Sequence, residues 1–223
     1  MRKKSALILA LAISAIFVGS VHSNILYANQ YVVTNIQSSY AIIGENTTTY
    51  DFSSGAGNDR WAYRDEVSQN PPSANNLPST EFNSAQYNRI SADDEIRQNE
   101  RADIGNYAAH RFVFFIYENE INITLLHILW NGIGTHDIWT DGATLYIWNC
   151  TSSSYELLDT NTSAIEINLE ANISSSIGNY ISSDGNLTVL VVQNRPSFRF
   201  WWFRFYSRLQ TDYIKVDITH TEG

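Results

Sequence analysis

Residues 198–206 read FRFWWFRFY, a run of seven aromatic side chains and two arginines, Arg199 and Arg204. The run lies between two stretches with strand character, residues 187–192 (LTVLVV) and residues 211–218 (TDYIKVDI). Because successive side chains of a strand point to opposite faces, one strand over this run would carry aromatic rings on both faces. We therefore expect at least one face to be buried and the other to be covered or used for contact.

Outward from this run, the chain is a series of short apolar segments separated by polar turns, which is typical of an antiparallel β-sandwich. The segments with strand character cover residues 31–36, 40–43, 61–63, 81–91, 111–117, 121–130, 143–148, 155–158, 165–169 and 187–193. Apolar residues at helical spacing predict one short helix over residues 172–182. The charged residues 93–103 fit either a second short helix or an exposed loop, and the proline-rich residues 65–80 predict a surface loop.

The N-terminus has the pattern of a secretory signal peptide. Three basic residues follow Met1, an apolar run extends to Val18, and Val21 and Ser23 are spaced as a cleavage signal requires. We therefore divide the chain into a signal peptide helix (residues 1–23), an extended segment (residues 24–49) and a β-sandwich domain (residues 50–223). The alternative is an uncleaved membrane anchor, and no other segment is apolar enough to cross a bilayer.

The charge of the chain excludes several classes of partner. The net charge is −9, and cleavage after Ser23 would remove three positive charges and no acids, which gives −12. A domain with this negative charge repels phosphate backbones. Nucleic acid and anionic membrane surfaces are therefore not expected as partners. The single cysteine, Cys150, has no partner for an internal disulfide, and the fold must be held by a hydrophobic core.

Six N-x-Ser/Thr sequons support export of the chain to a surface, because each is a potential glycan acceptor and is therefore expected to be exposed. The acceptor positions are Asn46, Asn122, Asn149, Asn161, Asn172 and Asn186.

Three groups of segments carry a resemblance to known domains. They are YDF (50–52) with GAG (55–57) and WAY (61–63), LYIWN (145–149) leading to YELLD (155–159), and TDYIKVD (211–217). The combination resembles uncharacterised extracellular domains of archaeal and some bacterial surface proteins. It is similar, more distantly, to the galactose-binding-like jelly roll of many carbohydrate-binding modules. This resemblance covers most of residues 50–218 but not the aromatic run, and it implies an all-β, antiparallel jelly-roll sandwich with an adhesive or glycan-binding role.

The aromatic run supplies the candidate ligand-binding residues, Arg199, Trp201, Trp202 and Arg204. Indole faces stack on sugar rings, and guanidinium groups are planar hydrogen-bond donors. Three interpretations remain open: a core strand or lid, a protein–protein contact, and a glycan site. Alternation along one strand would place Trp201 and Trp202 on opposite faces.

Loop acids supply candidate ligands for calcium, which requires six to eight oxygen donors. Asp93 and Asp94 are adjacent, and Asp212 opens the last predicted strand. The resemblance to calcium-binding carbohydrate modules implies that an acid near the start of the final strand is a ligand, which makes Asp212 the best candidate. The alternative is that all three are solvated loop carboxylates.

No catalytic pattern is present, because the histidines form no metal-ligand motif and neither G-x-S-x-G nor H-E-x-x-H occurs. We expect a secreted or cell-surface, non-enzymatic domain that binds an extracellular glycan or protein. The alternative is a self-associating subunit of a surface layer or filament, in which the alternating apolar residues 24–43 add a strand to a neighbouring subunit.

Overall fold

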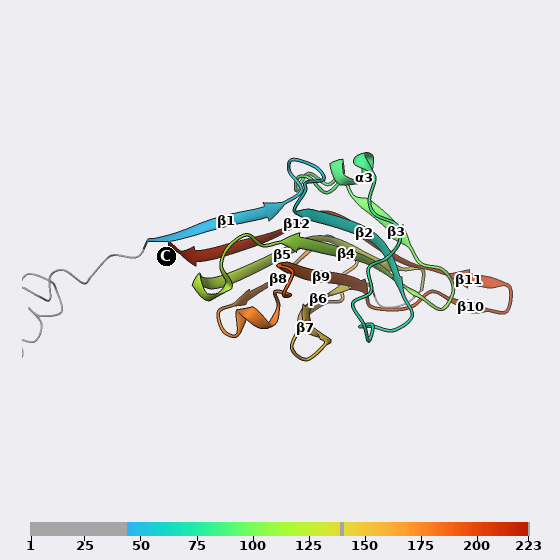
Figure 1. The fold of residues 1–223 in the computed structure, drawn as a ribbon. Helices are drawn as coiled ribbons and strands as arrows, with labels where there is room; N and C mark the ends of the chain where they lie inside the picture. Colours follow the sequence, from blue (N-terminus) through green and yellow to red (C-terminus); the bar gives the residue numbers. More distant parts are fainter. Residues whose placement is uncertain (1–43, 139–140, 223) are drawn as a thin grey trace, which may run out of the picture. The chain divides into compact units, whose positions relative to one another are not determined.

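The computed structural model describes residues 44–138 and 141–222, whose fold is drawn in Figure 1. The predicted signal peptide, residues 1–23, and residues 24–43 of the predicted extended segment lie outside the described residues. None of the described helices is long and apolar enough to span a membrane.

The described residues form an antiparallel jelly-roll β-sandwich, as the sequence predicts (Figure 1). The first sheet has the order β1–β12–β5–β8, with β3 also paired to β12, and the second has the order β2–β4–β9–β6–β7. The strands of the first sheet are β1 (Glu45–Asp51), β3 (Gln98–Arg101), β5 (Ile123–His136), β8 (Ile167–Ile173) and β12 (Ser207–Thr221). Those of the second sheet are β2 (Arg60–Val67), β4 (Tyr107–Phe115), β6 (Ala143–Asn149), β7 (Ser154–Asn161) and β9 (Asn186–Gln193). A separate hairpin consists of β10 (Phe198–Phe200) and β11 (Phe203–Phe205).

Alternation along the strands places one large apolar cluster between the two sheets. In β9, Leu187, Val189 and Val191 face this core, and in β12, Val216 and Ile218 do so from the other sheet. The intervening β9 residues Leu190 and Val192 belong to a second cluster with Tyr146 and Tyr155. Apolar residues on both faces explain why β9 is a nearly unbroken apolar run, and β9 lies in the middle of its sheet, as this run predicts.

The second apolar cluster is joined by hydrogen bonds to the proline-rich loop over residues 68–80. The Tyr155 hydroxyl donates to Asn75 Oδ1 at 2.7 Å, and the Arg111 guanidinium donates to Asn75 Oδ1 and to the Asn76 carbonyl. Arg111 is 2% exposed and is paired with Asp65 at 2.8 Å, so its buried charge is compensated. The predicted loop covered residues 65–80, but residues 65–67 are the end of β2; residues 68–80 have no regular structure, as predicted, and are held against the sheet.

A polar contact inside the core links the two sheets at β4, β5 and β12. Thr211 Oγ1 lies 2.9 Å from Trp130 Nε1, which donates to it, and 2.7 Å from His110 Nδ1. All three side chains are fully buried. The threonine hydroxyl therefore satisfies polar groups from both sheets at the centre of the sandwich.

Two predictions of secondary structure are wrong. Residues 172–182 are not a helix, because β8 continues to Ile173 and only Ile177–Asn179 form a single 3-10 turn, η2. Residues 81–91 are not a strand, because they contain the helix α3 (Ser84–Asn88). The Asn83 side chain accepts from the backbone of Gln86, whose side chain accepts from the Asn83 N–H, and this capping box starts the helix.

Two further boundaries differ from expectation. Residues 93–103, expected to be a helix or loop, include the strand β3. The first sheet begins at Glu45, so the last five residues of the predicted extended segment belong to β1, which pairs with β12 along its whole length. A second 3-10 turn, η1 (Glu120–Asn122), precedes β5.

Candidate functional site

The aromatic run folds as a β-hairpin and not as the single strand that we expected. The chain reverses at Trp201 and Trp202, and the register pairs Phe198 with Phe205, Arg199 with Arg204 and Phe200 with Phe203. Figure 1 shows this hairpin extending beyond the two sheets. A sequence with the same residue types on both sides of its centre, FRFW and WFRF, fits such a reversal.

The turn of the hairpin has an unusual backbone. Trp201 has a φ of 58°, a conformation that two-residue hairpin turns require but that a bulky residue rarely adopts. Arg199 Nε donates to the Trp201 carbonyl at 2.7 Å and so satisfies a polar group of the turn. The usual residue at such a position is Gly or Asn, so a tryptophan here is costly for the backbone and points to a use for its side chain.

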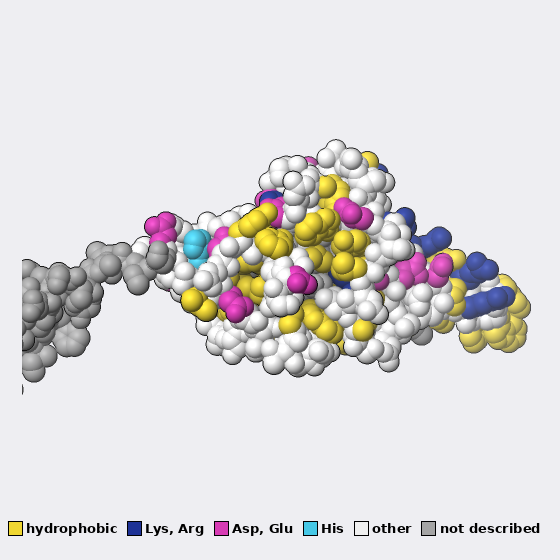
Figure 2. Space-filling model, viewed as in Figure 1, with side chains coloured by type: hydrophobic (Ala, Val, Ile, Leu, Met, Phe, Trp, Pro, Cys, Tyr) yellow, Lys and Arg dark blue, Asp and Glu magenta, His cyan; other side chains and the backbone are white. Residues whose placement is uncertain are grey.

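The tip of the hairpin exposes a continuous aromatic surface. Phe200, Trp201, Trp202 and Phe203 are 60%, 69%, 68% and 54% exposed. Their ring centroids follow one another at 6.0, 5.3 and 5.6 Å. In Figure 2 they form the hydrophobic end of the projection. The expectation that Trp201 and Trp202 lie on opposite faces, one of them buried, is therefore wrong.

The base of the hairpin is anchored to the sandwich. Phe198 stacks on His136 at the end of β5, with ring centroids 5.8 Å apart. The Arg101 guanidinium lies over the Tyr206 ring, 4.4 Å from its centroid. Arg208 pairs with Asp137, which also accepts from the Tyr206 amide at 2.8 Å. These contacts position the exposed tip relative to the two sheets.

Positive charge accompanies the aromatic tip. Arg199 and Arg204 face each other across the hairpin, and both are exposed. Basic side chains lie along the projection in Figure 2. At its base, Asp137 is paired with Arg208. The tip is therefore a local basic and aromatic surface on an acidic chain.

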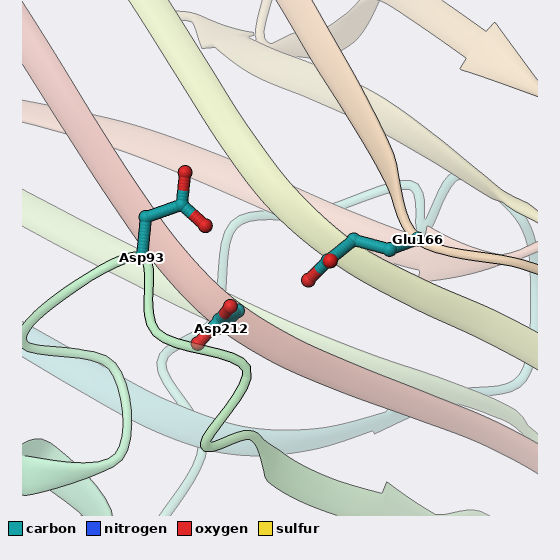
Figure 3. Close-up of side chains that lie close together, drawn as sticks. All are labelled: Asp93, Glu166 and Asp212. Carbon is teal, nitrogen blue, oxygen red and sulfur yellow. The ribbon is translucent and has the colours of Figure 1, made fainter.

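A second candidate site is a group of three carboxylates, Asp93, Glu166 and Asp212 (Figure 3). One oxygen from each lies within 4.8 Å of those of the other two. The side chains come from the loop before β3, from the residue before β8 and from β12, and Figure 3 shows them pointing toward one another. Of the three predicted ligands, the structure brings Asp93 and Asp212 together, and it adds Glu166, which the sequence analysis did not name.

Asp94, the third predicted ligand, is not a member of this carboxylate group. Its carboxylate accepts from the Ile96 amide at 3.0 Å. Nothing in residues 160–170 marks Glu166 as a ligand, because its proximity depends on β8 lying beside β5 in the sheet. That order is not readable from sequence spacing.

Burial dominates the electrostatics of Asp212. The residue is 0% exposed, and burial raises the pKa of its carboxyl group above the ordinary value. The backbone N–H groups of Glu95 and Asp94 lower this pKa, and the nearby Glu166 raises it. Oδ2 accepts from the Glu95 amide at 2.8 Å, whereas Oδ1 has no hydrogen-bond donor among the described residues.

The six sequons are not all exposed. Asn46, Asn161 and Asn172 are exposed, and Asn122 and Asn186 are half-buried. Asn149 is 6% exposed, its amide nitrogen donates to Glu156 at 2.6 Å, and its oxygen accepts from two backbone amides. The expectation of an exposed acceptor is therefore wrong at Asn149, whose side chain is hydrogen-bonded within the turn between β6 and β7.

Comparison with protein families and relatives gives one match over most of the sandwich. Residues 57–220 match the AF_1625_C family, described as "Uncharacterized protein, C-terminal domain". A relative from Archaeoglobus fulgidus, described as "Uncharacterized protein", is 35% identical over 116 residues. The aligned part is 51% of this chain and 18% of the relative, so the chain spans less than a fifth of that protein.

Two solved structures are similar at a low level. A mutant of a family 29 carbohydrate-binding module, CBM29-2, aligns over 80% of this chain and 93% of its own, with 10% identity and a TM-score of 0.36. A CBM28 module described as specific for non-crystalline cellulose aligns over 57% and 80%, with 16% identity and a TM-score of 0.24. These scores are too low to transfer a ligand or a site.

Proposed function

The chain belongs to the AF_1625_C family, and from the geometry of its hairpin we propose that it is a non-catalytic, secreted or cell-surface binding module. The contact surface is the aromatic tip formed by Phe200, Trp201, Trp202 and Phe203. The ligand is an extracellular glycan that carries acidic groups. The proposal rests on the hairpin and not on the likeness to carbohydrate-binding modules.

The observation that carries the proposal is the exposure of four consecutive aromatic side chains on a projecting hairpin. Exposed apolar surface of this kind marks contact sites, because water disfavours it unless a partner covers it. Aromatic rings stack on the C–H faces of sugars. The contact between the Trp201 and Trp202 rings gives two adjoining surfaces at the turn, where the sequence prediction placed them apart.

Charge favours an acidic glycan over a neutral one. Arg199 and Arg204 stand directly behind the tip, and guanidinium groups bind carboxylate or sulfate in a bidentate geometry. The remainder of the chain is acidic and repels such a ligand, so binding is expected to be confined to the hairpin.

A glycan array with neutral and acidic members tests the proposal. We expect the purified chain to retain uronic-acid or sulfated glycans. Replacing both Trp201 and Trp202 by alanine removes two stacking contacts, and we expect it to weaken binding about tenfold or more. The control is Tyr117→Ala, which removes a 67% exposed aromatic side chain outside the hairpin and should leave binding unchanged.

Two results would overturn the glycan assignment. One is equal retention by wild type and the double tryptophan variant. The other is a wild type that binds no glycan but forms oligomers which the double variant does not form, since the tip is then a protein contact. Retention of neutral and acidic glycans alike would remove the role given to Arg199 and Arg204.

A further inference from the structure

We propose that Asp93, Glu166 and Asp212 form a binding site for a calcium ion, which joins the loop before β3 to β8 and β12. The site is separate from the aromatic hairpin and independent of its ligand. Its evidence is the position of Asp212 in the sheet, the state of its two carboxylate oxygens, and the size of the carboxylate group.

The sheet places Asp212 at an irregular point of β12. The register with β5 shifts between Thr211, which pairs with Gly132, and Tyr213, which pairs with Asn131, so Asp212 is an additional residue without a partner in β5. On the other edge of β12, the pairing with β3 ends at Thr211 and that with β1 begins at Lys215. Such bulges redirect a side chain, and this one brings the carboxylate under the loop before β3.

The two oxygens of Asp212 are in different states. Oδ2 accepts from the Glu95 amide, and Glu95 has a φ of 68°, so the loop backbone is bent around the carboxylate. Oδ1 is buried and has no donor among the described residues. A buried charged oxygen without a donor is unfavourable, and the Asp212 carboxylate lies beside two further carboxylates, those of Asp93 and Glu166. A bound metal ion would satisfy it.

The size of the group fits calcium. Calcium–oxygen distances are about 2.4 Å, so two oxygens on one ion lie at most about 4.8 Å apart. The three oxygens meet this limit. Three carboxylates carry three negative charges. The cation that contacts them is Arg97, which donates to Glu166 Oε1 from Nη2 at 2.7 Å and from Nε at 3.2 Å. The remaining charge of the group matches a divalent ion.

A second oxygen without a donor lies beside the group in the sheet. Asn131 pairs with Tyr213 of β12 and with Asn168 of β8, so it stands next to Asp212 on one side and two residues from Glu166 on the other. Its Nδ2 donates to Asn168 Oδ1 at 2.8 Å, whereas its buried Oδ1 has no donor among the described residues. Amide oxygens are common calcium ligands, and water completes such sites.

The experiment is a calorimetric titration of the purified chain, first stripped with a chelator, using CaCl₂ and in parallel MgCl₂. We expect one calcium ion to bind, with weaker binding of magnesium, whose shorter bonds demand a smaller and more regular cage. Asp212→Asn and Glu166→Gln should each lower calcium affinity at least about tenfold. The matched control is Asp94→Asn, an acid of the same loop outside the group, which should bind within about twofold of wild type.

Thermal melting provides a second readout. Calcium should raise the melting temperature of wild type and Asp94→Asn, but not that of Asp212→Asn or Glu166→Gln. If the buried Asp212 variant fails to fold, Glu166→Gln and Asp93→Asn still test the site, because these side chains are half-buried and exposed. Absence of calcium binding by wild type would overturn the proposal, and so would equal affinity in Asp94→Asn and Glu166→Gln. Neither result affects the glycan proposal, which is measured on the hairpin variants.

Discussion

Two tryptophans show how the same side chain serves different purposes in this domain. Trp130 is 0% exposed and donates its indole N–H to Thr211, whereas Trp202 is 68% exposed at the hairpin tip. We expect Trp130→Ala to lower the free energy of unfolding by about 3–5 kcal/mol, because it opens a cavity and leaves Thr211 with one partner fewer. Trp202→Ala should change it by less than about 0.5–1 kcal/mol. Urea unfolding of both variants measures the difference, and similar losses would contradict the exposed position of the tip.

His110 gives the domain a pH dependence of known sign. The side chain is fully buried, and burial lowers its pKa to about 3, with the positive charge of Arg64 acting in the same direction. The unfolded chain therefore takes up a proton near pH 6.5 that the folded chain refuses until about pH 3. The stability that His110 contributes as a neutral group is fully present above pH 6.5 and is lost as the pH falls, by up to about 1.4 kcal/mol per pH unit.

His110→Gln removes this titration and keeps a polar side chain near Thr211. We expect wild type to lose stability more steeply than the variant between pH 6.5 and pH 4, as measured by urea unfolding at each pH. Carboxylates whose pKa is lowered in the folded state, such as Asp217, also make the fold less stable in acid, but this effect is the same in both proteins. Parallel curves for the two proteins would show that His110 does not titrate in this way.

The turn of the hairpin has a tryptophan at a position where glycine or asparagine is usual. We expect replacement of Trp201-Trp202 by Asn-Gly to keep or increase stability, by up to about 1 kcal/mol, because these residues adopt positive φ readily. The same change removes both indoles and should abolish glycan binding. Thermal melting and the glycan array measure the two effects. A large loss of stability would mean that the tryptophans hold the hairpin together and are not there for contact.

Sequence patterns predicted the elements whose burial is simple and failed where the pattern was ambiguous. The apolar runs of β4 and β9 were predicted near their true positions, because two covered faces leave few polar positions. In β12 buried and half-buried residues alternate, and only its central part, residues 211–218, was predicted as a strand. Ile173 and Ile177 are spaced as in a helix, yet they contact the core from separate segments. The capping box of Asn83 and Gln86 was a readable helix signal, but Phe82, Tyr87 and Ile90 were interpreted as residues of a strand.

At the scale of the whole domain, the candidate sites were predictable only in part. Asp93 and Asp212 are distant in sequence, and their proximity was proposed from an implied site and not from spacing. Glu166 could not be found, because the order β12–β5–β8 decides which loop residues meet, and short strands at even spacing do not reveal their order. The aromatic run was recognisable as a surface of interest, whereas its reversal at Trp201 depends on a single backbone conformation that a tryptophan seldom takes.

The first strand of the domain, β1, pairs with its last strand, β12, in the first sheet. β1 pairs with β12 from Glu45 opposite Thr221 to Asp51 opposite Lys215, and Tyr50 of β1 is buried in the core. The folded unit should therefore include β1, although the sequence pattern placed the domain start at residue 50. We expect a chain that begins at Gly44 to melt in one cooperative transition, because every β1 pair with β12 is kept.

A chain that begins at Phe52 loses seven residues of pairing and the Tyr50 side chain, whose hydroxyl donates to Glu118 at 2.7 Å. It also exposes an edge of β12, the strand at the centre of the first sheet. We expect this chain to unfold at a clearly lower temperature or to aggregate, as measured by calorimetry and light scattering. Equal melting of the two chains would show that β1 is an addition to a sandwich that is complete without it. In that case the core contact of Tyr50 would contribute little to stability.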